Sequence, residues 1–226
     1  MGIIALFYFI LLFSLVIHEA SHALFAKIGG DMTAYTGGQV TLNPLPHIRR
    51  EPFGTVILPL LMLFSSGGAM CMGYAHIPVD PVWAYQHPKR AALMSAAGPL
   101  SNLLLAAIAF VAMKAMLGGG IVQVSEYDPF PRVLPLYGDG GGAFEVACKA
   151  LSFLMILNLL LFIINLIPIP PLDGAGVVEG LFPNSLARII RELKRQPIVI
   201  LIVMIALLFS IMKIMTPIYL TVKGWL

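Results

Sequence analysis

The chain has 226 residues, of which 59% are hydrophobic and only 11% are charged, and its formal net charge is +3. This composition is far more apolar than that of a water-soluble domain and is typical of an integral membrane protein. The few charges are scattered, so the sequence does not predict a nucleic-acid-binding surface.

Four apolar runs are long enough to cross a bilayer as helices, which needs about 20 residues each. They cover residues 3–28, 91–117, 150–168 and 198–220. A shorter apolar run, residues 53–72, contains Pro59 and the flexible stretch 65–68 (SSGG), which favour a bent, re-entrant segment. The sequence therefore predicts an all-α polytopic membrane protein, with four spanning helices and one re-entrant segment in a single domain over residues 1–226.

A small β-hairpin is predicted directly after the first helix. Gly29 and Gly30 end the helical pattern, and the pattern of residues 33–42 predicts two short strands around a turn at Gly37 and Gly38. Such a hairpin either has a purely structural role or binds an extended peptide along its edge, and the sequence leaves both open.

The first helix carries the motif H-E-x-x-H as His18-Glu-Ala-Ser-His22. Histidines four residues apart share one helical face, so both can bind one Zn²⁺, and Glu19 can reach a water on that metal. Ionisable groups in the middle of a spanning helix are costly, which indicates a binding or catalytic role. The alternative is that these side chains only hydrogen-bond to one another within a packed bundle.

A catalytic zinc usually takes three protein ligands, and Asp173 is the best candidate for the third. Only Glu19 and Asp173 among the acidic residues lie in or beside strongly apolar segments without a nearby basic partner. The prolines of residues 168–171 (PIPP) break the preceding helix and free the Asp173 carboxylate from the helix surface. The alternative is a polar cap at the membrane boundary.

The depth of the two motifs predicts the topology. His18 lies roughly 22 Å along its helix and Asp173 roughly 28 Å along its own, so they meet if these helices run parallel. Residues 53–72 must then turn back within the membrane. This arrangement leaves Arg132 in the outer loop and puts most of the basic residues on the cytoplasmic side, with the site nearer that face: Lys27, Arg49, Arg50, Lys89, Arg90, Arg188, Arg191, Lys194 and Arg195. The amino terminus and the acidic loop 118–145 would face outward.

Three motifs together resemble the site-2 protease family of intramembrane zinc metalloproteases. They are the H-E-x-x-H motif, residues 97–102 (AGPLSN) and residues 165–174 (NLIPIPPLDG). Without the resemblance, the small residues of 97–102 indicate only a helix-packing seam. The chain is similar to the minimal prokaryotic branch, which has neither a PDZ domain nor a nucleotide-sensing domain.

The resemblance implies zinc on His18, His22 and Asp173, Glu19 as the catalytic acid and base, and Asn165 near the metal in substrate or oxyanion binding. It also implies a multi-pass protein of the cell membrane that cleaves membrane proteins with a single transmembrane helix. The leading alternative is a zinc or divalent-cation transport protein. Such a site needs a continuous polar path, yet the other helices carry few ionisable groups.

Overall fold

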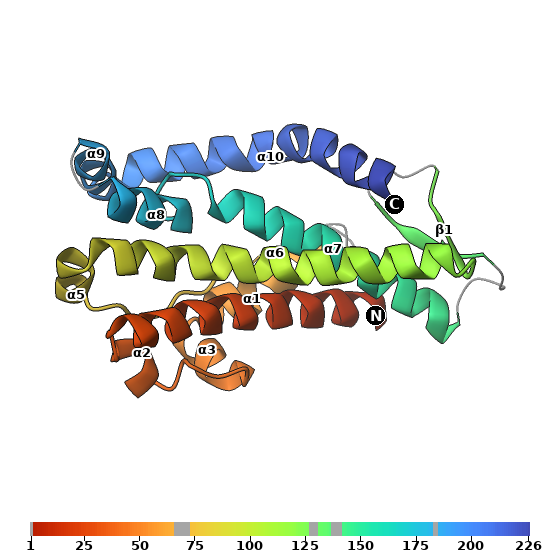
Figure 1. Cartoon of the computed structure of the whole chain (residues 1–226), viewed down its shortest axis with the longest axis horizontal. Coiled ribbons are helices and arrows are strands. Elements are labelled where there is room, and N and C mark those ends of the chain that lie inside the picture. Colours follow the sequence, from red (N-terminus) through yellow and green to blue (C-terminus); the bar gives the residue numbers. More distant parts are fainter. Residues whose placement is uncertain (1, 66–72, 127–130, 137–141, 183–184) are drawn as a thin grey trace.

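A computed structural model describes residues 2–65, 73–126, 131–136, 142–182 and 185–226, and most of these residues are helical (Figure 1). Within these ranges four helices are long and apolar enough to cross a membrane: α1 (Gly2–Gly29), α6 (Pro88–Gly118), α7 (Ala143–Asn165) and α10 (Pro197–Trp225). The prediction of four spanning helices is confirmed, and the chain is a multi-pass membrane protein.

The directions of the spanning helices bring the two predicted motifs to one end of the bundle. Figure 1 shows α1 and α7 running in one direction and α6 and α10 in the other. Helix α6 packs against both α1 and α7, and α1 also contacts α7 directly. The predicted parallel arrangement of α1 and α7 is therefore correct.

Between α1 and α6, the described residues form five short helices. They are α2 (Thr33–Thr36), α3 (Pro44–Arg50), the π-helix η1 (Phe53–Ile57), α4 (Leu58–Ser65) and α5 (Pro81–Gln86). The predicted hairpin at residues 33–42 is wrong, because this stretch forms α2 and a series of turns. The reason is local: the Asp31 carboxylate accepts a hydrogen bond from the backbone N–H of Thr33, 2.9 Å away, which favours a helical turn over an extended strand.

A small sheet occurs elsewhere, in the connection between α6 and α7. Strands β1 (Val122–Val124) and β2 (Val133–Pro135) pair antiparallel, with Val122 opposite Pro135. The backbone N–H of Val133 donates to Ser152 Oγ of α7, 3.1 Å away, and so ties the sheet to that helix.

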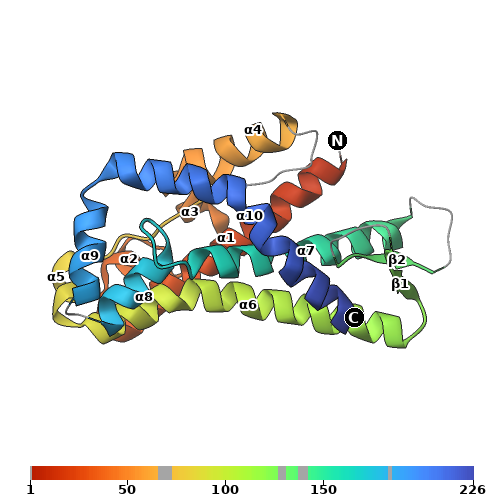
Figure 2. The same ribbon diagram turned by 90° about the horizontal axis from the view of Figure 1, so that it is seen from above.

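The residues on either side of the apolar run after α3 are hydrogen-bonded to each other. The backbone N–H of Tyr74 donates to Gly54 O at 3.0 Å, and Arg50 Nε donates to His76 O at 3.0 Å. Residues 73–76 therefore lie beside residues 50–54. Figure 2 shows α4 extending from the neighbourhood of α3 toward the amino-terminal end of α1. Residues 66–72, which include most of the predicted SSGG turn, lie outside the described residues.

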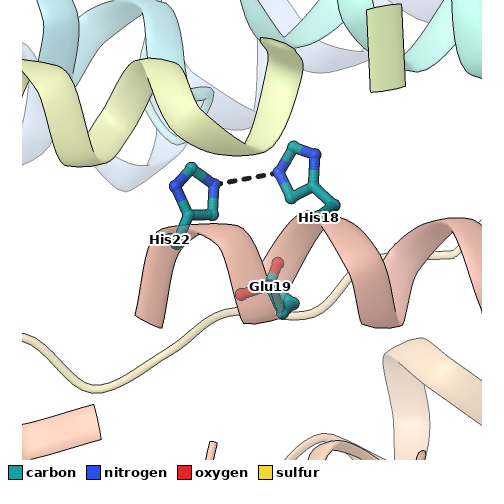
Figure 3. Close-up of side chains that lie close together, drawn as sticks. All are labelled: His18, Glu19 and His22. Carbon is teal, nitrogen blue, oxygen red and sulfur yellow. Dashed lines mark hydrogen bonds between the residues drawn. The ribbon is translucent and has the colours of Figure 1, made fainter. Parts of the chain in front are cut away.

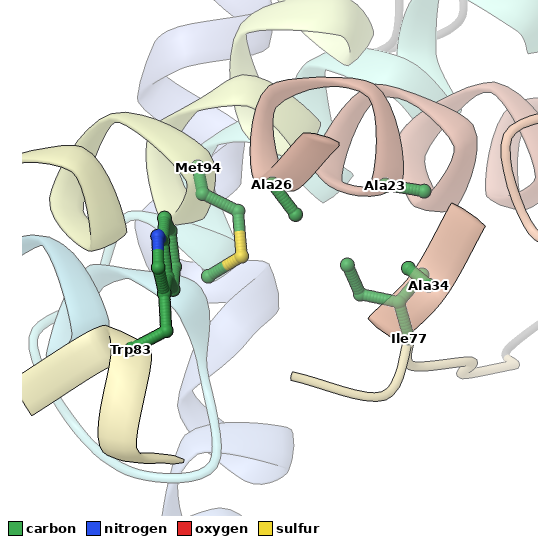
Figure 4. Close-up of a cluster of buried hydrophobic side chains, with 6 residues drawn as sticks. All are labelled: Ala23, Ala26, Ala34, Ile77, Trp83 and Met94. Atoms are coloured by element: carbon green, nitrogen blue, oxygen red, sulfur yellow. The ribbon is translucent and has the colours of Figure 1, made fainter. Parts of the chain in front are cut away.

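A buried apolar cluster fastens the end of α1 to the segments that follow it (Figure 4). Trp83 of α5 lies in this cluster together with five smaller buried side chains: Ala23, Ala26, Ala34, Ile77 and Met94. The indole N–H of Trp83 donates to Gly29 O at 3.0 Å, so the buried ring has its one polar atom paired. The cluster holds α1, α5 and α6 in a fixed arrangement.

Asp31 adds a polar connection beside this cluster. Its second carboxylate oxygen accepts from the backbone N–H of Asp80 at 2.9 Å, while the first accepts from Thr33. Burial alone would raise the pKa of Asp31, but the hydrogen bonds from Thr33 and Asp80 outweigh it and hold the pKa below its ordinary value. Asp31 therefore joins the α1–α2 turn to the start of α5.

Two short helices, α8 (Asp173–Leu181) and α9 (Ser185–Lys194), connect α7 to α10. Helix α8 packs very closely on α6, because its glycines carry no side chain at the contact. A Cβ added to Gly180 would overlap Pro88 O and lie 2.7 Å from the Cβ of Ala92, and one added to Gly176 would overlap Ser95 Oγ. This contact fixes the position of Asp173, the first residue of α8.

We expect Gly180→Ala to destabilise the protein, because the added methyl forces α8 away from α6. Overpacking of this kind costs about 1–3 kcal/mol of unfolding free energy. Thermal unfolding of the purified protein in detergent would measure the change. The matched control is Gly118→Ala, since a Cβ at Gly118 meets no atom within 4 Å. Equal melting temperatures for the two variants would contradict the close α6–α8 contact.

Candidate metal centre

Helix α1 presents two histidines toward the interior of the bundle, one helical turn apart. His18 and His22 are both buried, and their Nε2 atoms lie 3.0 Å from each other (Figure 3). Their spacing in the sequence puts them on one face of the helix, as predicted.

Asp173 completes a triangle of ligand atoms with the two histidines. Its Oδ2 lies 3.0 Å from His18 Nε2 and 3.3 Å from His22 Nε2. Zinc with four tetrahedral ligands at about 2.0–2.1 Å holds neighbouring ligand atoms about 3.3 Å apart. The three sides of 3.0, 3.0 and 3.3 Å therefore fit one zinc ion, with the fourth position left for water or substrate.

The other ring nitrogen of each histidine has its own hydrogen-bond partner. His22 Nδ1 lies 2.7 Å from the backbone oxygen of Met94, which can only accept a hydrogen bond. His18 Nδ1 lies 2.5 Å from Oδ1 of Asn102 on α6. Such partners orient ligand imidazoles and leave Nε2 available for a metal. Residues 97–102 predict close helix packing with Asn102 available for an interhelical hydrogen bond, but a single sequence does not indicate which polar group Asn102 meets.

Glu19 lies beside the two histidines with an unsatisfied charge-bearing atom. It is only 3% exposed, and its Oε2 has no hydrogen-bond partner. One carboxylate oxygen of Glu19 and one ring nitrogen of each histidine lie within 4.8 Å of one another. A buried polar atom without a partner is costly, so this oxygen is left available to a ligand within the site.

Gly98 allows α6 to approach the histidines. A Cβ at this position would overlap His22 Nε2 and lie 2.6 Å from His18 Nε2. Residues 97–102 were interpreted as a packing seam, and they are one, since Gly98 and Asn102 are both buried in α6. The surface packed against this seam is the metal centre itself.

The metal centre opens into a cavity of about 850 Å³ with mostly apolar walls. Helix α10 contributes Ile205 and Ile211, and α7 contributes Leu161 and Ile164. Asn165 also lines this cavity, but its Nδ2 donates to Leu161 O of its own helix at 3.0 Å. The structure thus brings Asn165 to the same cavity as the histidines.

The segment of residues 73–80 forms another wall of the cavity. Residues 73–80 have no regular secondary structure, and six of them line the cavity: Gly73, Tyr74, Ala75, His76, Ile77 and Val79. His76 Nε2 lies 3.2 Å from a carboxylate oxygen of Glu51, which helps to hold this segment in place. No motif marks these residues, so only the fold reveals them.

Comparison with known proteins agrees with this geometry. The sequence profile of "Peptidase family M50" matches residues 6–211. The "Putative zinc metalloprotease YwhC" of Bacillus subtilis is 36% identical over 174 residues, which cover 76% of this chain and 67% of that protein. The "Putative zinc metalloprotease Rip2" of Mycobacterium tuberculosis strain Erdman is 29% identical over 214 residues, covering 95% of this chain and 67% of the relative.

A second Rip2 protein, from Mycolicibacterium smegmatis, is 28% identical over 194 residues, covering 86% of this chain and 64% of the relative. The chain therefore spans about two thirds of the length of these relatives. No solved structure matches it significantly. Since the family profile covers most of the chain, the protein belongs to peptidase family M50, the site-2 protease family of membrane zinc metalloproteases.

Proposed function

We propose that this protein hydrolyses peptide bonds in or near the transmembrane segments of other membrane proteins, using zinc held by His18, His22 and Asp173. The observation that carries the proposal is the triangle of three ligand atoms, 3.0 to 3.3 Å apart, beside the unpaired carboxylate oxygen of Glu19. This ligand set leaves one zinc position open, as catalytic sites do.

Each side chain has a distinct role in this proposal. Zinc at these ligands would lower the pKa of a bound water and polarise the scissile carbonyl. Glu19 would accept the proton of the attacking water and then deliver it to the leaving amine. Its burial among apolar side chains keeps bulk water from competing for that proton. We assign Asn165 to substrate or oxyanion binding, because it lines the same cavity.

The cavity supports membrane proteins as the substrates. Its walls are mostly aliphatic, which suits the apolar side chains of a transmembrane segment better than a polar peptide. A peptide bond within a helix is shielded by its own hydrogen bonds, so the substrate must unwind locally before its carbonyl reaches the site. We propose that the substrates are proteins with a single transmembrane helix. Such a helix has no packing contacts with other helices of its own protein that must be broken before it enters the cavity.

Cation transport, the alternative function, has no support from the relatives, which carry metalloprotease names. It also requires further ligands along a path through the membrane. In hydrolysis Glu19 would act as the acid and base, whereas a simple transit site for a cation needs no such group.

We propose that residues 53–72 enter the membrane and return to the same side. The hydrogen bond between Tyr74 N–H and Gly54 O supports this, because it joins the two ends of the segment. Figure 1 places the end of α1, the start of α6 and helix α9 at one end of the bundle. These three elements carry Lys27, Lys89, Arg90, Arg188, Arg191 and Lys194. The opposite end has Lys114, Arg132, Lys149 and Lys223, and the excess at the first end favours a cytoplasmic location.

The first prediction from this proposal concerns metal content. We expect about one zinc per chain in the purified protein, measured by inductively coupled plasma mass spectrometry. His18→Ala and Asp173→Ala should each lose it, because either change removes one of three ligands. The control is Glu192→Ala, which removes only a surface ion pair with Arg195. Full zinc occupancy and activity in Asp173→Ala would show that the third ligand is another residue.

The second prediction concerns Glu19. Glu19→Gln should abolish proteolysis while most of the zinc stays bound, since the amide keeps the shape of the side chain but cannot accept a proton. Cleavage of a panel of single-span membrane proteins, reconstituted with the enzyme in liposomes, would measure this. Zinc flux that persists in Glu19→Gln liposomes when no cleavage is seen in wild type would favour transport instead.

The third prediction concerns orientation in the membrane. Single cysteines at Tyr85 of α5 and Gln123 of β1, both exposed, should label from opposite sides with an impermeant maleimide. The background should lack Cys71 and Cys148. Tyr85 should react only from the cytoplasmic side, and labelling of both positions from one side would disprove the proposed topology.

A further inference from the structure

A series of buried side-chain hydrogen bonds runs from His18 through α6 and α7 and returns to α1 one helical turn before His18. It consists of Asn102 on α6, Asn158 on α7 and Ser14 on α1, none of them exposed to any measurable extent. Asn102 Nδ2 donates to Asn158 Oδ1 at 2.7 Å, and Asn158 Nδ2 donates to Ser14 Oγ at 2.8 Å. The other end of the series is His18, whose Nδ1 meets Asn102 Oδ1.

The direction of every bond in this series follows from two backbone carbonyls, which can only accept. Ser14 Oγ donates its one hydroxyl proton to Ile10 O, 2.8 Å away. Toward Asn158, Ser14 Oγ can therefore only accept a hydrogen bond. Asn158 also donates to Leu154 O at 2.9 Å, so both contacts require its NH₂ group. The oxygen of Asn158 must therefore point to Asn102.

The orientation of the Asn158 amide determines which nitrogen of His18 carries the proton. Because Asn158 presents its oxygen, Asn102 must present its NH₂ group to Asn158 and its own oxygen to His18. An amide oxygen can only accept, so His18 must carry its proton on Nδ1, and the lone pair of Nε2 is left facing Asp173 and His22. Only this tautomer of His18 can bind zinc in the observed geometry.

We propose that Asn102 and Asn158 are positioning residues that fix the tautomer of His18 for zinc binding. The inference rests on the proposed zinc site, but it extends to two residues that touch neither metal nor substrate. Asn158 matters because an amide can rotate: without it, Asn102 is free to turn its NH₂ group toward His18 Nδ1, which would require the opposite, unproductive tautomer. Burying two amides in a lipid-embedded bundle is costly, and this role gives them a purpose.

The test has a readout that does not depend on catalysis. In metal-free wild-type protein with ¹⁵N-labelled histidine, long-range ¹H–¹⁵N NMR should show His18 protonated at Nδ1, with the signal assigned by its loss in His18→Ala. Nδ1 of His22 should also be protonated, because Met94 O accepts from it. A His18 signal with Nδ1 unprotonated would overturn the proposal.

Substitutions of Asn102 and Asn158 test the same series of hydrogen bonds. The measured quantity is the zinc affinity, determined by competition with a chelator. Asn102→Leu should weaken binding about 10–100-fold, as loss of such outer partners does. Asn158→Leu should also weaken it, although residue 158 does not touch His18. The control is Ser152→Ala, a buried α7 hydroxyl hydrogen-bonded to Val133 and Cys148 instead. It should bind zinc as wild type does.

A rescue variant separates tautomer control from a general loss of packing. In Asn102→Asp the carboxylate can only accept from His18, whatever residue 158 does, so Asn102→Asp/Asn158→Leu should regain the affinity lost in Asn158→Leu. Wild-type affinity in both leucine variants, or no rescue in the double variant, would overturn the inference. Absence of zinc from wild type itself would instead refute the proposed function, and the NMR result on metal-free protein would still decide the tautomer.

Discussion

The structure depends on one constraint: polar ligands for a metal must be buried where neither water nor lipid can satisfy them. Two histidines and two carboxylates lie at the interface of α1, α6 and α8. Each polar atom there needs a partner from another helix, and most have one, such as Met94 O for His22 and Asn102 for His18. The exception among these atoms is Oε2 of Glu19, which has no hydrogen-bond partner. Gly98 of α6 lets this helix lie close to the histidines of α1, and Gly176 and Gly180 let α8 lie close to α6.

Much of the fold was predictable because hydrophobic length is a strong signal in membrane proteins. The four spanning helices came from apolar runs alone, and the parallel directions of α1 and α7 came from the depth at which His18 and Asp173 occur. The three candidate ligands were predictable because ionisable residues in an apolar segment demand a reason. The structure brings these three together.

The errors and omissions have a common physical cause, which is that tertiary partners cannot be read from a single sequence. Residues 33–42 looked like a hairpin, but the Asp31 side chain stabilises a helical turn there. The strands lie instead in the α6–α7 connection, where Ser152 gives β2 a hydrogen-bond partner. Asn102 and Asn158 were visible as polar residues in helices, yet their roles depend on contacts across 84 and 144 positions of sequence.

The separation of the ligands along the chain has a consequence for biosynthesis. His18 and Asp173 are 155 residues apart, and α8 reaches its place only by packing on α6. At about 5–20 residues per second, a ribosome needs roughly 8–30 s to make the intervening chain. During that time the chain carries only two of the three proposed ligands, so the proposed site is incomplete. A newly inserted chain therefore cannot cut its neighbours at the translocon, because the order of synthesis delays the hazardous chemistry until the bundle has assembled.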